Sequence, residues 1–229
     1  MKTKTNQKVV RRIVFFLILC TFAACNRKLD EDGGYYDPKT KTYIYVHPAA
    51  AKKKTSRYPV SNPTDGEIQR IKAIVTHIGE DAKSLWIRID SRRPYMILAQ
   101  SVSGNNRNDK DKEIRISLDY VSPSGSANRG NKFRQQWKTY TAKVLKKELF
   151  KQPVLADIRY AERSRKFWGT LYKIIHTDKG DRLRDMNLWM VNQGLSFYFI
   201  NNGKSPKDKE YLAVQKISRA NKRGLWSYP

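Results

Sequence analysis

The sequence contains few cysteines and few histidines. Its two cysteines, Cys20 and Cys25, both lie in the first 25 of 229 residues. A framework of disulfides is therefore excluded for the rest of the chain. The three histidines, His47, His77 and His176, are isolated, and no pair has the spacing of metal ligands. A zinc site is not expected.

Acidic residues are also scarce. Asp and Glu number 21 against 46 Lys and Arg, which gives a net charge of +25. Such an excess is informative about partners rather than about fold. The partners it favours are nucleic acid, an anionic membrane or an anionic polysaccharide, and simple solubility is the alternative. The sequence has neither a glycine-rich phosphate loop nor a Ser-His-Asp order, so the chemistry of those sites is not expected.

The first 24 residues have the pattern of a signal peptide. A segment with five basic residues precedes a short apolar run, 13–22, which is too short to span a bilayer comfortably. The small residues Ala23 and Ala24 before Cys25 resemble the lipobox of bacterial lipoproteins. We expect Cys25 to be lipidated and to become the new N-terminus. The alternatives are an ordinary signal peptide cleaved after Ala24 and an uncleaved anchor.

Residues 25–65 have the composition of a flexible tether, because this polar, Lys-rich and Pro-containing stretch cannot bury a core. Its cluster KLDED, 28–32, resembles the acidic surface-export signals of some diderm bacterial lipoproteins, and a solvated linker is an equally good interpretation. The predicted location is the cell envelope, lipid-anchored to the membrane, with the surface of the outer membrane as one option. The chain after the signal keeps 41 basic residues against 21 acidic ones.

From residue 66 onward the sequence predicts strands and helices in a definite order. Five segments have the alternation or β-branched content of strands: 68–78, 85–89, 114–118, 154–160 and 167–175. Three segments have helical spacing or cap signals: 132–149, 186–192 and the segment that begins at Ser205. This order fits a five-stranded OB-type β-barrel with about three helices, a fold that binds nucleic acids through its groove.

Three motifs resemble those of the staphylococcal nuclease-like (thermonuclease-like) family. Residues 185–195, DMNLWMVNQGL, resemble the family's VN..LV..GLA segment, and residues 222–227, KRGLWS, resemble its closing GLW motif. Residues 167–171, FWGTL, occupy the place of its YGRxL strand. With the order of elements, the resemblance covers residues 66–229. It implies the OB-fold barrel, and by itself it says nothing of activity.

The resemblance also implies a set of catalytic positions. Enzymes of that family hydrolyse phosphodiesters with a calcium ion held by carboxylates, a glutamate that activates water and two arginines that stabilise the developing charge. Arg115 matches the first catalytic arginine, with an exposed strand arginine as the alternative. Glu80 matches a metal carboxylate, with Asp81 as its neighbour and an ordinary turn acid as the alternative. Calcium is the cofactor expected if the domain is active.

Other required positions carry residues that lack the necessary chemistry. Val121 and Ser124 fall where the metal aspartate and the glutamate base belong, and Gly169 falls on the second arginine. Asp119 supplies a ligand only if the register shifts. Because loss of a general base alone costs ~10² to 10⁴ in rate, we expect no efficient hydrolysis by the family mechanism.

The predicted nucleic-acid-binding residues are Arg163, Arg165 and Lys166, which lie close to Gly169 in the sequence. The leading hypothesis is an envelope-anchored nuclease-like domain with a degenerate active site, which binds nucleic acid or another polyanion. Its membrane partner is reached through the lipid on Cys25. One alternative is an active metal-dependent endonuclease with a displaced site. The other is a structural envelope lipoprotein whose charge serves lipopolysaccharide or teichoic-type anions.

Overall fold

The computed structural model describes residues 60–123, 130–177, 180–200 and 204–228, together with the backbone of β1 (Gly34–Asp37) and β2 (Thr42–Tyr45). The predicted signal peptide and Cys25 lie outside the described residues. The chain divides into two units, 1–54 and 55–229. In the first unit, β1 and β2 pair as an antiparallel hairpin inside the predicted tether. Within the described ranges, no helix is long and apolar enough to cross a membrane.

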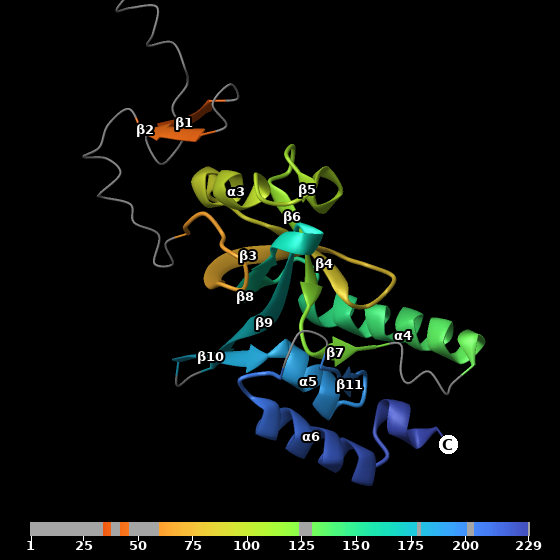
Figure 1. Ribbon diagram of the computed structural model, residues 1–229. Coiled ribbons are helices and arrows are strands. Elements are labelled where there is room, and N and C mark those ends of the chain that lie inside the picture. Colours follow the sequence, from red (N-terminus) through yellow and green to blue (C-terminus); the bar gives the residue numbers. More distant parts are fainter. Residues whose placement is uncertain are drawn as a thin grey trace, which may run out of the picture. The chain divides into compact units, whose positions relative to one another are not determined.

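Five strands of the second unit close into a barrel (Figure 1). They are β3 (Ile68–Ile78), β4 (Ser84–Arg88), β6 (Glu113–Leu118), β8 (Pro153–Ala161) and β9 (Lys166–Thr177). Antiparallel pairing joins β6 to β4, β4 to β3, β3 to β8 and β8 to β9. The parallel pair β6–β9 then completes the ring. The predicted five-stranded OB-type barrel is therefore confirmed.

Side-chain alternation along the strands separates the core from the outer face. In β6, Ile114, Ile116 and Leu118 are buried, whereas Arg115 and Ser117 between them are half-buried. Successive residues of a strand point to opposite sides, so the apolar set fills the barrel and the polar set faces outward. A one-residue change of register would exchange the two sets, and burial of the isoleucines therefore fixes where Arg115 points.

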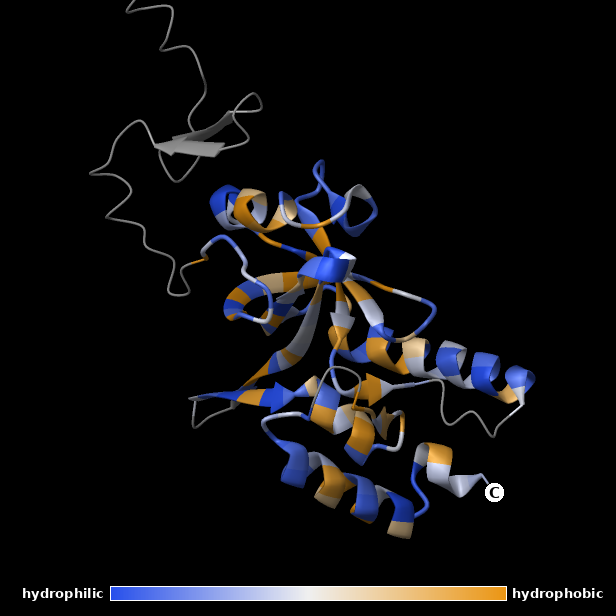
Figure 2. Cartoon of the chain, in the orientation of Figure 1, coloured by the Kyte–Doolittle hydropathy of each residue, from blue (hydrophilic) through white to orange (hydrophobic). Residues whose placement is uncertain are grey.

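The described part of the chain contains four α-helices, whereas the sequence predicted about three. They are α3 (Arg92–Ala99), α4 (Asn131–Leu149), α5 (Met186–Asn192) and α6 (Asp208–Ala220). The addition is α3, which contacts β6 and buries Tyr95 and Leu98. Its Pro94 lies in the first turn, where a missing N–H disturbs no helical hydrogen bond. In Figure 2, α4 and α6 carry both hydrophobic and hydrophilic residues, as helices that cover a core with one face do.

Several shorter elements were also absent from the prediction. β10 (Gly180–Asp185) extends β9 as a hairpin, β5 (Arg107–Asn108) pairs with β6, and β7 (Val121–Ser122) pairs with β11 (Phe197–Tyr198). Three 3₁₀ turns complete the described elements: η1 (Gly104–Asn106), η2 (Glu162–Ser164) and η3 (Gly224–Ser227). These elements add short pairings to the barrel, and the pairing of β6 with β9 still closes it.

The predicted N-cap of α6, Ser205, lies two residues before the observed one. The helix begins at Asp208, and its N-cap residue, Lys207, makes no side-chain cap. Ser205 Oγ instead accepts a hydrogen bond from the backbone N–H of Lys207 at 3.1 Å, and Asp208 accepts one from the Tyr198 hydroxyl at 2.6 Å. The residues expected to cap the helix therefore hold the preceding turn against β11. Asp208 still lies in the first helical turn, where a negative charge is favourable.

Two glycines of the family-like motifs touch each other. Gly194 follows α5 with φ +67°, and Gly224 begins η3 with φ +51°. The backbone N–H of Leu225 donates to Gly194 O at 2.8 Å. A Cβ at Gly194 would lie 2.1 Å from the carbonyl oxygen of Arg223, and one at Gly224 would lie 2.5 Å from that of Gly194. Only glycine fits both positions, so the two motifs are one packing contact.

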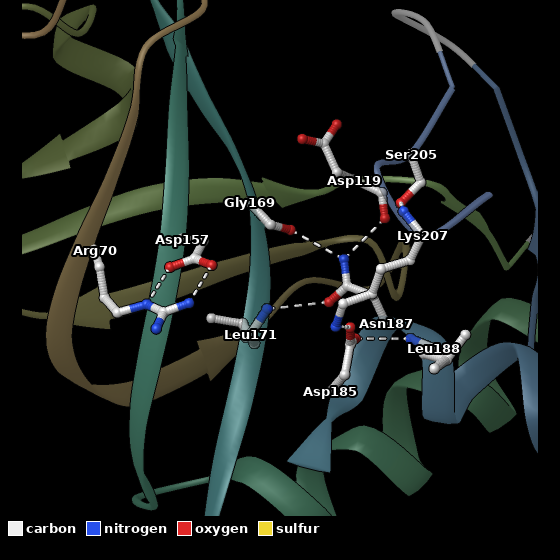
Figure 3. Close-up of polar contacts among 10 residues, drawn as sticks. All are labelled: Arg70, Asp119, Asp157, Gly169, Leu171, Asp185, Asn187, Leu188, Ser205 and Lys207. Atoms are coloured by element: carbon white, nitrogen blue, oxygen red, sulfur yellow. Dashed lines mark hydrogen bonds and ion pairs between the residues drawn. The ribbon is translucent and has the colours of Figure 1, made fainter. Parts of the chain in front are cut away.

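The side-chain amide of Asn187 joins α5 to both strands of the parallel seam (Figure 3). Its Nδ2 donates to the carbonyl oxygens of Asp119 at 2.8 Å and Gly169 at 3.0 Å, and its Oδ1 accepts from the N–H of Leu171 at 3.2 Å. Asn187 is fully buried. A buried amide that makes all these bonds holds the end of β6, β9 and α5 in a fixed arrangement.

We expect Asn187→Leu, which keeps the approximate volume, to lower the free energy of unfolding by about 2–5 kcal/mol, because buried backbone groups lose their partner. Denaturant unfolding of the full chain measures this difference. The matched control is Asn105→Leu at an exposed position of η1, which should change stability little. Equal effects of the two substitutions would contradict the role assigned to the amide.

Candidate functional site

Basic and aromatic side chains gather on the outer face of the barrel. Lys83, in the turn between β3 and β4, has its Nζ 4.8 Å from the centre of the Trp168 ring, and Lys166 Nζ lies 4.3 Å from the same centre. Lys83 Nζ is also 5.6 Å from the ring centre of Phe199. These are cation–π distances. We call Lys83, Lys166, Trp168 and Phe199 the Trp168 patch.

The strands explain why these residues meet. In β9, Phe167 and Leu171 are buried and point into the barrel, so Lys166 and Trp168 point outward. The parallel register pairs Ile116 with Phe167, which sets Arg115 of β6 level with Lys166. Arg115 therefore shares the outer face with the Trp168 patch.

Exposure differs between the two aromatic rings of the patch. Trp168 is only 8% exposed, because the two lysines and its surroundings cover it, whereas Phe199 is 44% exposed. The lysine ammonium groups and the phenylalanine ring are therefore the parts that a ligand can contact. Phe199 is held in place by its N–H, which donates to Tyr120 O at 3.0 Å.

The ammonium group of Lys83 is partly desolvated. Burial lowers its pKa below the ordinary value for lysine, the charge of Asp119 opposes this effect, and the charge of Lys166 adds to it. An anion that binds between the two lysines would relieve their mutual repulsion. The electrostatics of the patch therefore suit a phosphate or another anionic group.

Arg115 lies in a small polar network with the β3–β4 turn. Its Nη2 donates to Ser84 Oγ at 2.9 Å and lies 3.9 Å from the carboxylate of Asp81. Asp81 also accepts hydrogen bonds from the hydroxyl and N–H of Ser84 and from the N–H of Lys83. Burial alone would raise the pKa of Asp81, but these hydrogen bonds and Arg115 lower it. The structure thus brings Asp81 to Arg115, while Glu80, the predicted metal carboxylate, is exposed on the turn.

Asp119 follows β6 and is committed to another partner. It is 6% exposed, and both of its carboxylate oxygens lie 3.2 Å from Nη2 of Arg159. Burial raises the pKa of the Asp119 carboxyl, and Arg159 opposes that shift. Asp119 and Arg159 therefore form a largely buried ion pair, in which each charge has the other as its partner.

The remaining family positions lie where the backbone leaves little freedom. Val121 is fully buried in β7, opposite Tyr198 of β11. A Cβ at Gly169 would come within 3.0 Å of the carbonyl oxygen of Asp157, so a larger side chain there requires the strand to shift. Ser124 lies outside the described residues. In the described ranges, no group of three or more His, Cys, Asp or Glu residues is arranged to hold a metal ion.

The three predicted nucleic-acid-binding residues lie in two adjoining elements and the residue between them. Arg163 is exposed in η2, and Arg165 follows it in the left-handed region with φ +46°. The carbonyl oxygen of Arg165 accepts a hydrogen bond from the N–H of Ser103, which fixes this turn. Of the three, Lys166 joins the Trp168 patch, whereas the two arginines lie on the connection between β8 and β9.

Three residues of the patch are not predicted as site residues from the sequence. Trp168 is placed only in a strand, although the alternation of the apolar residues Phe167 and Leu171 on either side indicates that it points outward. Lys83 and Phe199 have no comparable signal, because each lies in a connection and reaches the patch only through the fold. Tertiary structure was needed to find them.

Fold and motifs together define a nuclease-like OB-fold domain. The model of the family described as staphylococcal nuclease homologue matches residues 115–228, which run from β6 to the end of η3. This part of the chain belongs to that family.

Among solved structures, 17 chains match. One is the extended Tudor domain of Drosophila melanogaster Tudor-SN (p100), which is 12% identical, with a TM-score of 0.48, over 70% of this chain and 100% of that chain. A comparison with curated proteins gave no match.

Proposed function

We propose that the domain binds nucleic acid or another polyanion through the Trp168 patch and Arg115. The observation that carries this proposal is the placement of Lys83 and Lys166 over one indole ring, beside the half-exposed ring of Phe199. Single-stranded nucleic acid offers alternating phosphates and bases, and proteins that bind it combine cations with aromatic rings. Membership of a nuclease-homologue family and the charge of +25 support the same kind of ligand.

We further propose that the domain binds without efficient hydrolysis, as a degenerate nuclease. Val121 is buried in the core, and Gly169 has no side chain that could supply a guanidinium group. The carboxylates of Asp81 and Asp119 are engaged by hydrogen bonds and by Arg159, so the described residues do not fit a calcium site. One observation favours the competing hypothesis of an active nuclease: Arg115, which matches a catalytic arginine, lies 3.9 Å from the carboxylate of Asp81.

Binding of a labelled single-stranded DNA oligonucleotide should weaken steeply as salt rises, with little sequence preference. Lys83→Ala and Lys166→Ala should each lower affinity and reduce the slope of log K against log salt by about 0.7, the value for one lost phosphate contact on a single strand. Fluorescence anisotropy measures both quantities. Arg163→Ala is the matched control, because it removes the same charge outside the patch.

Equal losses from Arg163→Ala and Lys166→Ala would show attraction by net charge rather than binding at the patch. Absence of any binding by the wild type at low salt would exclude nucleic acid as the ligand. In that case the structural envelope role would be favoured, with lipopolysaccharide or teichoic-type anions as partners, and binding to such a polysaccharide would test it.

The full chain should not cleave DNA or RNA efficiently with calcium, magnesium or manganese. The physical reason is that a general base and a second transition-state arginine are lacking, and a lost base alone costs ~10² to 10⁴ in rate. A gel assay on both substrates provides the measurement. Robust metal-dependent cleavage that is abolished by Arg115→Ala, and by Glu80→Ala or Asp81→Ala, would instead establish an active nuclease with a displaced site.

We also propose that the protein is anchored in the cell envelope through a lipid on Cys25. The basic n-region, the short apolar run and the small residues before Cys25 support this location. One myristoyl-sized chain gives only marginal membrane binding, whereas multiple chains or a basic patch give stable anchoring. The excess of basic residues would reinforce attachment to an anionic surface.

Cys25→Ala should leave the precursor uncleaved or release the protein from the membrane fraction. Cell fractionation with metabolic lipid labelling measures both effects. Cys20→Ala is the internal control, because that residue lies in the segment that cleavage removes. Unchanged processing and membrane partition of Cys25→Ala would argue for an ordinary signal peptide or an uncleaved anchor.

A further inference from the structure

A second candidate site lies between α4 and the C-terminal segment, where the ring of Tyr228 contacts those of Phe133 and Trp137. It is an open pocket of about 440 Å³, a volume typical of small-molecule sites. Its lining is mainly aromatic, with the amide of one glutamine and a few backbone and hydroxyl groups: Phe133, Gln136, Trp137, Tyr140, Gly224, Ser227 and Tyr228. We call this the aromatic pocket.

Four aromatic rings shape the aromatic pocket. Phe133 and Trp137 are nearly parallel, at 8° and 6.0 Å between centres, and Tyr228 stands across them at 65° and 71°. Trp137 also contacts Tyr140 at 5.2 Å. The pocket therefore presents two parallel rings, those of Phe133 and Trp137, and one ring, that of Tyr228, which is steeply inclined to them. A flat ligand that lies on such rings gains both stacking and edge contacts.

Trp137 is buried and fixed in place, whereas Tyr140 and Tyr228 are accessible to a ligand. Trp137 is 7% exposed, and its Nε1 donates to the carbonyl oxygen of Leu195 at 3.0 Å. Tyr140 and Tyr228 are 52% and 49% exposed. Tyr140 has the helical spacing of the apolar residues of α4, such as Trp137, and yet half of it is exposed to solvent at the pocket. Grouped, half-exposed aromatic rings over an open pocket mark a binding site rather than a core.

The segments that build the aromatic pocket carry cations and no acids. From residue 131 to residue 147, α4 has no Asp or Glu, and neither has the chain from residue 211 to its end. Lys132 precedes Gln136 by four residues, and Lys143 follows Tyr140 by three, so both are neighbours of the lining on the helix surface. A ligand with a flat neutral part and a negative charge at the rim complements this distribution.

We propose that the aromatic pocket binds the base of a nucleotide, with its phosphate at the basic rim formed by Lys132 and Lys143. The choice of a nucleotide over another flat anion rests on the proposed function. The pocket itself is built from α4 and η3, whereas the Trp168 patch is built from β9 and the turns beside it. A single strand would thus meet two stacking sites, and a free nucleotide would occupy the aromatic pocket alone.

The experiment titrates the full chain with adenosine, AMP and ribose 5-phosphate by calorimetry. AMP should bind more tightly than either adenosine, which lacks the phosphate, or ribose 5-phosphate, which lacks the base. Tyr140→Ala and Tyr228→Ala should each weaken AMP binding by at least about fivefold, the smallest effect typical of a lost stacking contact. Lys143→Ala should reduce the advantage of AMP over adenosine.

Phe150→Ala is the matched control, because Phe150 is an exposed aromatic residue directly after α4 that does not line the pocket. It should leave AMP binding unchanged. Equal binding of ribose 5-phosphate and AMP, or equal effects of Tyr140→Ala and Phe150→Ala, would overturn the proposal. So would Tyr140-dependent binding of galacturonic acid without binding of AMP, which would identify a sugar pocket.

Lys166→Ala separates this proposal from the proposed function. It should weaken binding of the oligonucleotide and leave AMP binding intact. If the wild type binds the oligonucleotide at the Trp168 patch but does not bind AMP, the proposal of a nucleotide in the aromatic pocket is overturned and the proposed function is not. AMP binding without any oligonucleotide binding would overturn the proposed function alone.

Discussion

The amide of Asn187 is the interaction on which the rest of this domain depends. The parallel pairing of β6 and β9 closes the barrel at Leu118 and Gly169, and Asn187 bonds to the backbone at and just beyond that seam. The helix that carries it is itself fixed, because Asp185 accepts from the N–H of Leu188 and pairs with Lys207 at 2.8 Å. Loosening the amide would therefore loosen the barrel and its helices together.

The same closure determines what the outer face offers. At the seam, Gly169 lies close to β8, where a Cβ would come 3.0 Å from the carbonyl oxygen of Asp157, while its neighbour Trp168 points outward and contacts two lysines. Where the family uses an arginine, this chain presents ammonium groups spread over an indole ring. Lysine ammonium groups attract phosphate as point charges, and this is the property on which the proposed polyanion binding rests.

Much of the fold followed from the sequence, because alternation and helical spacing are local signals. The five barrel strands, α4 and α5 were predicted close to their observed bounds. The helix α3 was missed because its short sequence contains Pro94, and the start of α6 was misplaced because Ser205 and Asp208 bond to the turn and to Tyr198. The candidate site was only partly predictable: Arg115 and Lys166 lie on strands, whereas Lys83 and Phe199 reach them through turns whose course depends on tertiary packing.

The central claim is that a polyanion binds at the Trp168 patch, and photo-crosslinking tests it most directly. Single-stranded DNA that carries a photoreactive base would be crosslinked to the full chain at moderate salt, and the modified peptides identified by mass spectrometry. The account predicts crosslinks at Phe199 and within residues 166–168. It also predicts that these crosslinks are lost in the double variant that carries both Lys83→Ala and Lys166→Ala. Crosslinks confined to the lysine-rich stretch 52–54, with none on the barrel, would contradict it.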